Sequence, residues 1–396
     1  MSGDEQRPRP RVHARPAPRA DASQRLLAVR ALPVTAASLE ALVAAAHDPT
    51  VEVAREAIGR LIALGEPARR ALRQLVWAAE PVLTDQLAHG LAGLHDPDPI
   101  GEARVRLRSP RYSERVAAVA VLDAYADPAN ASLLRHAATD EIAAVRHRAL
   151  IAIRRLSNAP ENWTLARDAL TDRDPQVRGA AVAAVAALST EPGRDLADVV
   201  ADPNAGVRRE LARVAAKLTP ETTRRLLADE DDHVRELVAE HAGAQALDAL
   251  CDALRRDRRP AVRQLAARRL AALRIEATAV LIDALGDSDA IVRAAATRSL
   301  SELHPRRQLL ERLAAAACDR DRPGRPAIVY ALARLDAREL APTLASLIDD
   351  RDPAVRLAVV HAAARLDADA VIEGLRGDAD ATVRQAAETA WDRSHG

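Results

Sequence analysis

The sequence contains no phenylalanine and only three tryptophans and three tyrosines, although 48% of its 396 residues are hydrophobic. A compact domain of this length normally fills its centre with aromatic side chains. Their scarcity argues against one large globular core. Alanine, leucine and valine supply the hydrophobic content instead, and these side chains suit thin layers of closely packed helices.

An excess of either charge is also missing, because 57 basic residues balance 57 acidic ones. Lys217 is the only lysine, so the other basic residues are all arginine. A protein that binds nucleic acid through general electrostatics usually shows a clear basic excess. Any basic surface on this chain must therefore be local.

Cysteine is nearly absent, and Cys251 and Cys318 lie far apart without a CxxC motif, so neither a disulfide framework nor a zinc site is expected. The sequence has no signal-peptide pattern and no apolar run fit to span a membrane. We therefore expect a cytoplasmic protein. One segment differs from the rest of the chain in composition. Residues 1–20 combine arginine and proline with few apolar side chains to bury, which predicts a disordered basic arm.

A repeat fills the rest of the chain. "DRDPQVRGAAVAAVAAL" at 172–188 recurs as "DSDAIVRAAATRSLSEL" at 287–303 and "DRDPAVRLAVVHAAARL" at 350–366. Val-Arg pairs recur about every 30 residues, and Arg325 takes the arginine position in a degenerate copy. Extending the period backwards gives twelve units. An aspartate lies six residues before the arginine position in ten of them: Asp48, Asp140, Asp172, Asp202, Asp229, Asp257, Asp287, Asp319, Asp350 and Asp378.

Each unit reads as two helices. The second helix places apolar residues at −1, +3, +7 and +10 from the arginine, such as Val292, Ala296, Leu300 and Leu303. The segment between the helices carries aspartate and proline, where Asp289 or Asp352 can cap a helix. Two such helices bury both apolar faces only by stacking on neighbours, which predicts a solenoid. Residues 21–32 read as a lone second helix that caps the N-terminal end.

This motif resembles HEAT repeats, and the short alanine-rich units are similar to the HEAT-like repeats of phycobilisome lyases. The resemblance covers residues 34–394 and is specific for the fold. It implies an all-α, right-handed α-α superhelix of about twelve two-helix repeats over residues 21–396. It also implies that the recurrent aspartates and arginines form a structural ladder between units: Asp172, Arg178, Asp202, Arg208, Asp287, Arg293, Asp350 and Arg356. "PGRPAIVYAL" at 323–332 departs from the pattern and leaves the register there open.

The resemblance also implies that the second helices line the concave side, where solenoids bind partners. Positions +5 and +9 from the arginine point away from the predicted core. From Arg213 onward they form a locally basic face with one aromatic side chain, a composition common at binding hot spots. The predicted binding residues are Arg213, Arg268, Arg298, Tyr330, His361, Arg334 and Arg365.

Catalytic motifs are absent: no GxGxxG, GxxxxGK[ST], HExxH or GxSxG is present, and no two histidines are spaced i, i+4. We therefore predict a non-enzymatic scaffold without catalytic residues, cofactor or metal, which binds an acidic or extended segment of another protein. One alternative is a nucleic-acid-binding protein similar to the alkylpurine DNA glycosylases, and a lyase is a third. Trp77, Trp163 and Trp391 occupy different phases of distant units, which does not suit a single base-binding pocket.

Overall fold

The computed structural model describes residues 21–156, 159–273, 277–302, 306–335, 339 and 341–395. The predicted arm at 1–20 and Leu303 lie outside the described residues. Every regular element of the described part is helical, as predicted for an all-α fold. The chain divides between residues 157 and 158 into two compact units, which we call unit 1 and unit 2.

First and second helices alternate along the chain, so that even-numbered helices are first helices and odd-numbered ones are second helices. In unit 1 the second helices are α1 (Ala22–Ala31), α3 (Val51–Leu64), α5 (Pro81–Gly93), α7 (Tyr112–Tyr125) and α9 (Ala143–Leu156). Its first helices are α2 (Leu39–Ala45), α4 (Arg69–Ala78), α6 (Asp98–Arg106) and α8 (Ala131–Ala137). Short 3-10 turns extend three of these, at Ala36–Ser38, Glu66–Ala68 and Pro128–Asn130.

Unit 2 continues the alternation. Its second helices are α11 (Pro175–Leu188), α13 (Ala205–Arg213), α15 (Asp232–His241), α17 (Pro260–Ala272), α19 (Ala290–Ser301), α21 (Arg325–Arg334), α23 (Pro353–Arg365) and α25 (Ala381–His395). Its first helices are α10 (Pro160–Asp168), α12 (Pro192–Asp195), α14 (Pro220–Leu227), α16 (Leu247–Arg256), α18 (Thr278–Ala284), α20 (Arg306–Cys318), α22 (Ala341–Ala345) and α24 (Asp369–Leu375). Its 3-10 turns are Ala169–Thr171, Ala197–Ala201, Ala215–Lys217 and Ala244–Ala246.

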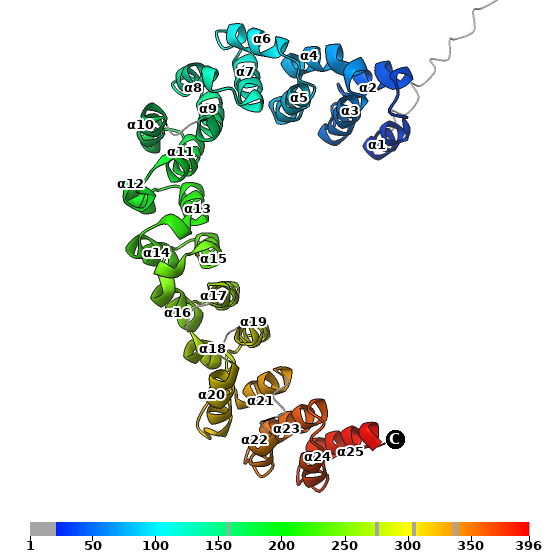
Figure 1. Ribbon diagram of the computed structural model, residues 1–396, viewed down its shortest axis with the longest axis vertical. Helices are drawn as coiled ribbons and strands as arrows, with labels where there is room; N and C mark the ends of the chain where they lie inside the picture. Colours follow the sequence, from blue (N-terminus) through cyan, green and yellow to red (C-terminus); the bar gives the residue numbers. More distant parts are fainter. Residues whose placement is uncertain are drawn as a thin grey trace, which may run out of the picture. The chain divides into compact units, whose positions relative to one another are not determined.

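Helices of the same kind stack on one another in each unit. In unit 2, α11, α13, α15, α17 and α19 pack side by side in one layer, while α14, α16 and α18 form the other (Figure 1). This stacking of two-helix units is the predicted α-solenoid. The described part contains twelve first helices and thirteen second helices, because α1 precedes the first pair.

The core lies between the two layers and is built from small aliphatic side chains. On α19 the predicted stripe is buried, with Val292, Ala296 and Leu300 all fully inaccessible. The facing stripe on α18 includes Leu281 and Leu285, which are also fully buried. The valine before the repeated arginine is buried in every Val-Arg repeat, so this position anchors each second helix in the core.

The start of each second helix follows from the aspartate-proline segment. The side chain of Asp352 accepts a hydrogen bond from the Ala354 amide at 2.9 Å, and Asp289 accepts one from the Ile291 amide at 2.8 Å. The predicted caps are therefore confirmed. Pro353 occupies the first turn of α23, where a backbone donor has no helical partner. No helix of the described residues is long and apolar enough to cross a membrane.

Gly324 lies where the backbones of two successive turns of unit 2 are in close contact, and we expect Gly324→Ala to destabilise the protein. Its φ is 74°, and an added Cβ would lie 2.2 Å from the Cα of Gly286 in the preceding turn. The left-handed conformation costs a non-glycine residue about 1–2 kcal/mol, and overpacking adds about 1–3 kcal/mol. Thermal unfolding measures the loss. Gly377→Ala is the matched control, because nothing lies within 4 Å of a Cβ added there. Equal midpoints for the two variants would show that the turns do not touch.

Candidate functional site

Arginine and aspartate side chains connect many of the repeats to the next at the start of the second helices. Arg178 on α11 donates through Nε and Nη2 to the carboxylate of Asp202, at 2.7 and 2.9 Å. Its Nη1 donates to the backbone carbonyl of Asp172, six residues earlier, at 2.9 Å. Asp202 also accepts a hydrogen bond from the Asn204 amide at 2.8 Å. We call such an arginine–aspartate pair between repeats a rung.

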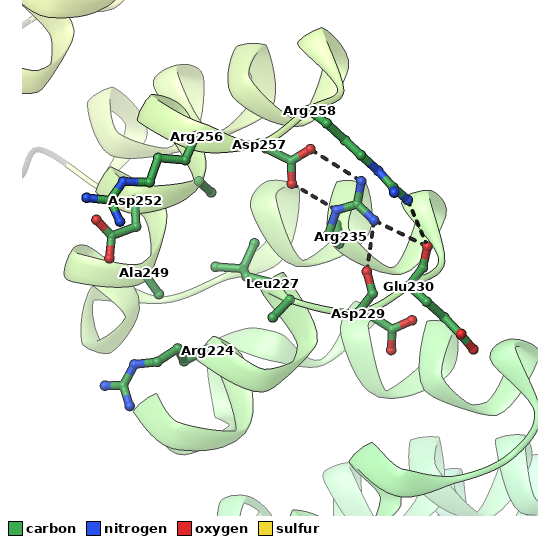
Figure 2. A pocket seen from close by; sticks show the side chains of 12 residues that line it. Arg224, Leu227, Asp229, Glu230, Arg235, Ala249, Asp252, Arg256, Asp257 and Arg258 are labelled. Atoms are coloured by element: carbon green, nitrogen blue, oxygen red, sulfur yellow. Dashed lines mark hydrogen bonds and ion pairs between the residues drawn. The ribbon is translucent and has the colours of Figure 1, made fainter.

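The same contact recurs in both units. The described rungs are Arg25–Asp48, Arg115–Asp140, Arg178–Asp202, Arg208–Asp229, Arg235–Asp257, Arg263–Asp287, Arg325–Asp350 and Arg356–Asp378. Figure 2 shows the Arg235–Asp257 rung, with Nη1 of Arg235 directed at the Asp229 carbonyl 2.8 Å away. Two parallel N–H bonds to a carboxylate are directional, so each rung sets how one repeat sits on the next.

Burial makes the rungs strong electrostatic contacts. In the Arg208–Asp229 rung the side chains are only 8% and 7% exposed. The bond from Arg356 holds the pKa of Asp378 below its ordinary value, and the Asp380 amide lowers it further. Burial alone would raise the pKa of Asp202, but the bonds from Arg178 and the Asn204 amide outweigh it, so this pKa is also lowered. Asp202 and Asp378 are therefore held as carboxylates.

The predicted ladder residues take different places in this scheme. Asp202, Asp287 and Asp350 accept from the arginine of the preceding repeat, while Arg178, Arg208 and Arg356 donate to the aspartate of the following one. Asp172 offers its backbone carbonyl to Arg178 and accepts the Asp174 amide at 2.9 Å.

Arg293 requires a correction, because no carboxylate of the described residues pairs with it. Its Nη1 donates at 2.8 and 2.9 Å to the carbonyls of Asp287 and Ser288, as in a normal rung. The aspartate six residues before the next rung arginine, Asp319, is exposed and makes no ion pair with it. Sequence position alone predicted that Arg293 belongs to the ladder, but Arg293 forms no rung with a described aspartate.

The predicted binding residues lie on the layer of second helices, which we call the second-helix face. Arg268 on α17 and Arg298 on α19 are exposed, and neither forms an ion pair within the part of the chain that the structure describes. They line an open groove of about 510 Å³ across α15, α17 and α19. Glu240 and Glu302 line the same groove, so its charge is mixed.

The other predicted face residues differ in how they are held. The rings of Tyr330 and His361 stack across α21 and α23 with centroids 6.0 Å apart. Burial raises the pKa of the Tyr330 hydroxyl. Arg213 lies 3.3 Å from Glu210 on its own helix. Arg334 is exposed and has no ion-pair partner among the described residues.

Arg365 caps the C-terminal end of α21, because its Nε donates to the Ala333 carbonyl at 3.1 Å. Lys217 does the same to the Ala186 carbonyl at 2.6 Å, and Arg269 to the Ala242 carbonyl at 2.6 Å. The last carbonyls of a helix lack intrahelical donors, and these cations supply them. Of these three, Arg365 and Lys217 occupy position +9, so this position supplies contacts between repeats as well as exposed charge.

The comparisons with known proteins agree with this geometry. A sequence profile of HEAT repeats matches residues 247–322 and 307–391, which run from α16 into α25. Residues 247–391 of this chain are therefore HEAT repeats. The rungs at Arg115, Arg178 and Arg208 show the same repeat geometry outside the matched span.

Several solved structures are similar to this chain, and no curated protein sequence matches it. One is YibA of Escherichia coli, with 16% identity over 70% of this chain and 95% of that chain, at a TM-score of 0.34. Another is the karyopherin Kap121p bound to the extreme C-terminus of the protein phosphatase Cdc14p, with 14% identity, coverage of 92% and 51%, and a TM-score of 0.46. Kap121p bound to RanGTP matches with 13% identity, coverage of 90% and 49%, and a TM-score of 0.47. The chain spans about half the length of Kap121p.

A buried charge cluster on the second helices of unit 1 escaped the sequence analysis. The Asp123 side chain on α7 is fully buried and accepts from Arg148 and Arg155 of α9, at 3.2 and 3.4 Å. Arg148 also pairs with Asp85 of α5. The HEAT motif carries no sign of these residues, because only one other repeat has an aspartate at this position, Asp392.

The three tryptophans of the chain contact different partners. Trp77 and Trp163 lie on the first helices α4 and α10, with indole N–H groups bonded to Glu102 and Asp195 at 2.8 and 3.2 Å. Trp391 on α25 stacks on His395 with ring centroids 4.0 Å apart. The tryptophans therefore give no support to a base-binding pocket of the glycosylase kind. No group of His, Cys, Asp and Glu within the described residues could hold a metal ion.

A further pocket of about 490 Å³ lies between α14 and α16 (Figure 2). Leu227 and Ala249 supply apolar lining, and the Arg235–Asp257 rung lines the pocket as well. Arg258 bonds the Glu230 carbonyl at 3.3 Å and Asp232 at 3.1 Å. The charged groups at this end of the pocket are thus already engaged in stacking HEAT repeats.

Proposed function

We propose that this protein is a non-catalytic scaffold that binds an acidic, extended segment of a partner protein along the second-helix face of unit 2. One observation carries the proposal. Arg268 and Arg298 are exposed in one groove, and neither has an ion-pair partner among the described residues. The rung arginine of the Arg268 repeat, by contrast, is paired with the next repeat, in Arg263–Asp287.

The spacing of the helices suits an extended chain. Packed helices lie about 8–10 Å apart, and an extended polyproline II segment rises about 3.1 Å per residue with three residues per turn, so every third side chain points the same way. Side chains three positions apart in such a segment therefore meet successive repeats. Carboxylates at that spacing would reach Arg268 and then Arg298, with the Tyr330–His361 stack further along the same face.

The mixed charge of the groove favours a protein partner over a polyphosphate. Glu240 and Glu302 lie beside the two arginines and would repel a continuous line of phosphates. An acidic peptide has separate carboxylates, and its neutral positions can lie against the glutamates. Nucleic acid is therefore an outcome to be tested and not the function proposed.

Binding of a labelled, capped peptide with aspartate at every third residue tests the proposal. We expect the double variant Arg268→Glu/Arg298→Glu to weaken binding by at least about tenfold, or about 1.4 kcal/mol. The matched control is Arg194→Glu/Arg307→Glu, which changes net charge equally at exposed sites on the first helices α12 and α20. We expect the control to retain the affinity, and both variants to unfold at the temperature of the unmodified protein.

Two results would overturn this function. An equal loss in the control would show that net charge alone attracts the peptide. Tighter binding of a labelled single-stranded oligonucleotide, with a steep dependence on salt, would put nucleic acid in place of the acidic segment.

A further inference from the structure

The ladder of unit 2 is interrupted between α19 and α21. Arg293 is anchored as a rung arginine is, through Nη1 bonds of 2.8 and 2.9 Å to the carbonyls of Asp287 and Ser288. In the rung one repeat earlier, Nε and Nη2 of Arg263 hold the Asp287 carboxylate at 2.7 and 2.8 Å. The corresponding edge of Arg293 makes no hydrogen bond within the described residues.

The interruption follows from the sequence "PGRP" at 323–326. Pro326 has no backbone donor, so it is tolerated only in the first turn of a helix. Helix α21 therefore begins at Arg325, whereas α11 and α17 begin three residues before their rung arginines, Arg178 and Arg263. The first turn of α21 is missing, and Gly324 in the left-handed conformation takes its place.

The loss of this turn changes the surroundings of Asp319. The Nε of Arg325 donates to the Ala317 carbonyl at 2.9 Å. A regular rung arginine such as Arg178 instead donates from Nη1 to the carbonyl of the residue six positions earlier. Asp319 is exposed, and its carboxylate accepts only the Asp321 amide, at 3.2 Å, among the described residues. It therefore leaves the open edge of Arg293 unfilled.

Packing changes at the same place. Helix α19 packs less extensively against α21 than α17 does against α19. Other contacts join the repeats in this region. Arg322 before α21 pairs with Asp283 of α18, and one repeat further on Arg351 donates to the Arg320 carbonyl at 2.8 Å. The guanidinium of Arg293 is thus preoriented by its own repeat, while the neighbouring repeat supplies no carboxylate.

We propose that Arg293 is a binding site for an aspartate or glutamate side chain that a partner protein supplies in trans. The partner carboxylate would take the position of the missing rung aspartate and receive the Nε and Nη2 donors together. A carboxylate is the ligand that every closed rung selects, and a guanidinium edge matches its two oxygens. Asp283 in the last turn of α18 and Asp321 in the turn before α21 add negative charge to this region and disfavour a more highly charged phosphate group. This site does not depend on the groove at Arg268 and Arg298.

A short peptide that copies the aspartate segment of a closed rung provides a probe for this site. Residues 350–355, "DRDPAV", would be made as a capped peptide and added to the full chain labelled with ¹⁵N-arginine. Arg384 is replaced by glutamine throughout, because its Nη1 is anchored in the same way, to the Asp378 carbonyl at 2.6 Å. We expect the Nε–H resonance of Arg293 to shift with millimolar affinity and that of Arg178 to stay unchanged. Arg293→Lys, which cannot form two parallel bonds, should weaken peptide binding by at least about tenfold.

Further variants make the test decisive. Transplanting "DRDPAVRL" onto 319–326 restores the missing turn, so we expect it to raise the unfolding temperature and to abolish peptide binding at Arg293. Asp319→Ala should leave the unfolding temperature unchanged, whereas Asp229→Ala should lower it. The proposal fails if Asp319→Ala destabilises as much as Asp229→Ala, because Asp319 would then close the rung. It also fails if inorganic phosphate shifts the Arg293 resonance as strongly as the peptide, or if the peptide leaves that resonance in place.

Discussion

Arg208→Ala is expected to lower the free energy of unfolding by about 3 kcal/mol, because it breaks a buried ion pair and leaves one partner behind. Asp229 would keep only the Asp231 amide, at 2.9 Å, as a described hydrogen-bond donor, with its side chain 7% exposed. The loss should be concentrated locally, since each repeat of a solenoid contacts only its neighbours. Amide exchange in α13 and α15 should therefore accelerate more than exchange in α23.

Arg293→Ala provides the matched control for this experiment. It removes an arginine from the equivalent position of another repeat, but one without a described carboxylate partner. We expect a loss of about 1 kcal/mol, from two hydrogen bonds to partly exposed carbonyls. Urea unfolding followed by circular dichroism compares the two variants. Equal losses would mean that anchoring to the carbonyls, and not the pairing between repeats, is what stabilises the stack.

Acid should destabilise the whole array in a narrow range of pH. The folded protein lowers the pKa of rung aspartates in both units: Asp48, Asp140, Asp202, Asp287, Asp350 and Asp378. The ordinary aspartate value is about 3.9. A lowered folded pKa contributes stability that is complete above the unfolded value and is lost as the pH falls through the folded one. These groups should therefore leave stability flat between about pH 5 and pH 8 and reduce it below about pH 4.

The dependence should be steep because many rungs titrate together. Each proton taken up on unfolding adds a slope of about 1.4 kcal/mol per pH unit. Urea unfolding at a series of pH values measures this slope. The variant Arg178→Gln/Asp202→Asn removes one rung without leaving a charge behind, so its slope below pH 4 should be shallower than that of the unmodified protein. An unchanged slope would place the acid sensitivity in other carboxylates.

The two-helix repeat could be predicted from local signals alone. Helical periodicity, the buried valine before the arginine and the capping aspartates all act within about fifteen residues, and Asp352 and Val355 behave as their positions predict. The first capping helix also carries a rung, Arg25–Asp48, which the Val-Arg pattern missed because Gln24 and not a valine precedes that arginine. A search for aspartates 21 to 25 residues after an arginine would have found it.

The candidate site was less predictable. Positions +5 and +9 located Arg268 and Arg298 on the second-helix face, but the engagement of Arg365 with a neighbouring carbonyl depends on where α21 ends. The buried Asp123 cluster joins α5, α7 and α9, and no single repeat contains a sign of it.

Repetition in the amino-acid order was enough to establish the helical pairs, their number and the residues that form their core, because these depend on neighbours along the chain. Which aspartate each arginine reaches was decided only in three dimensions. Arg178 lies six residues from Asp172 and 24 from Asp202, and its fork uses both, the first through a backbone carbonyl and the second through the carboxylate. At Arg293 the guanidinium is anchored in the same way as in a rung. Pro326, whose effect the repeat pattern did not predict, removes the first turn of α21, and the carboxylate of the next repeat does not pair with Arg293.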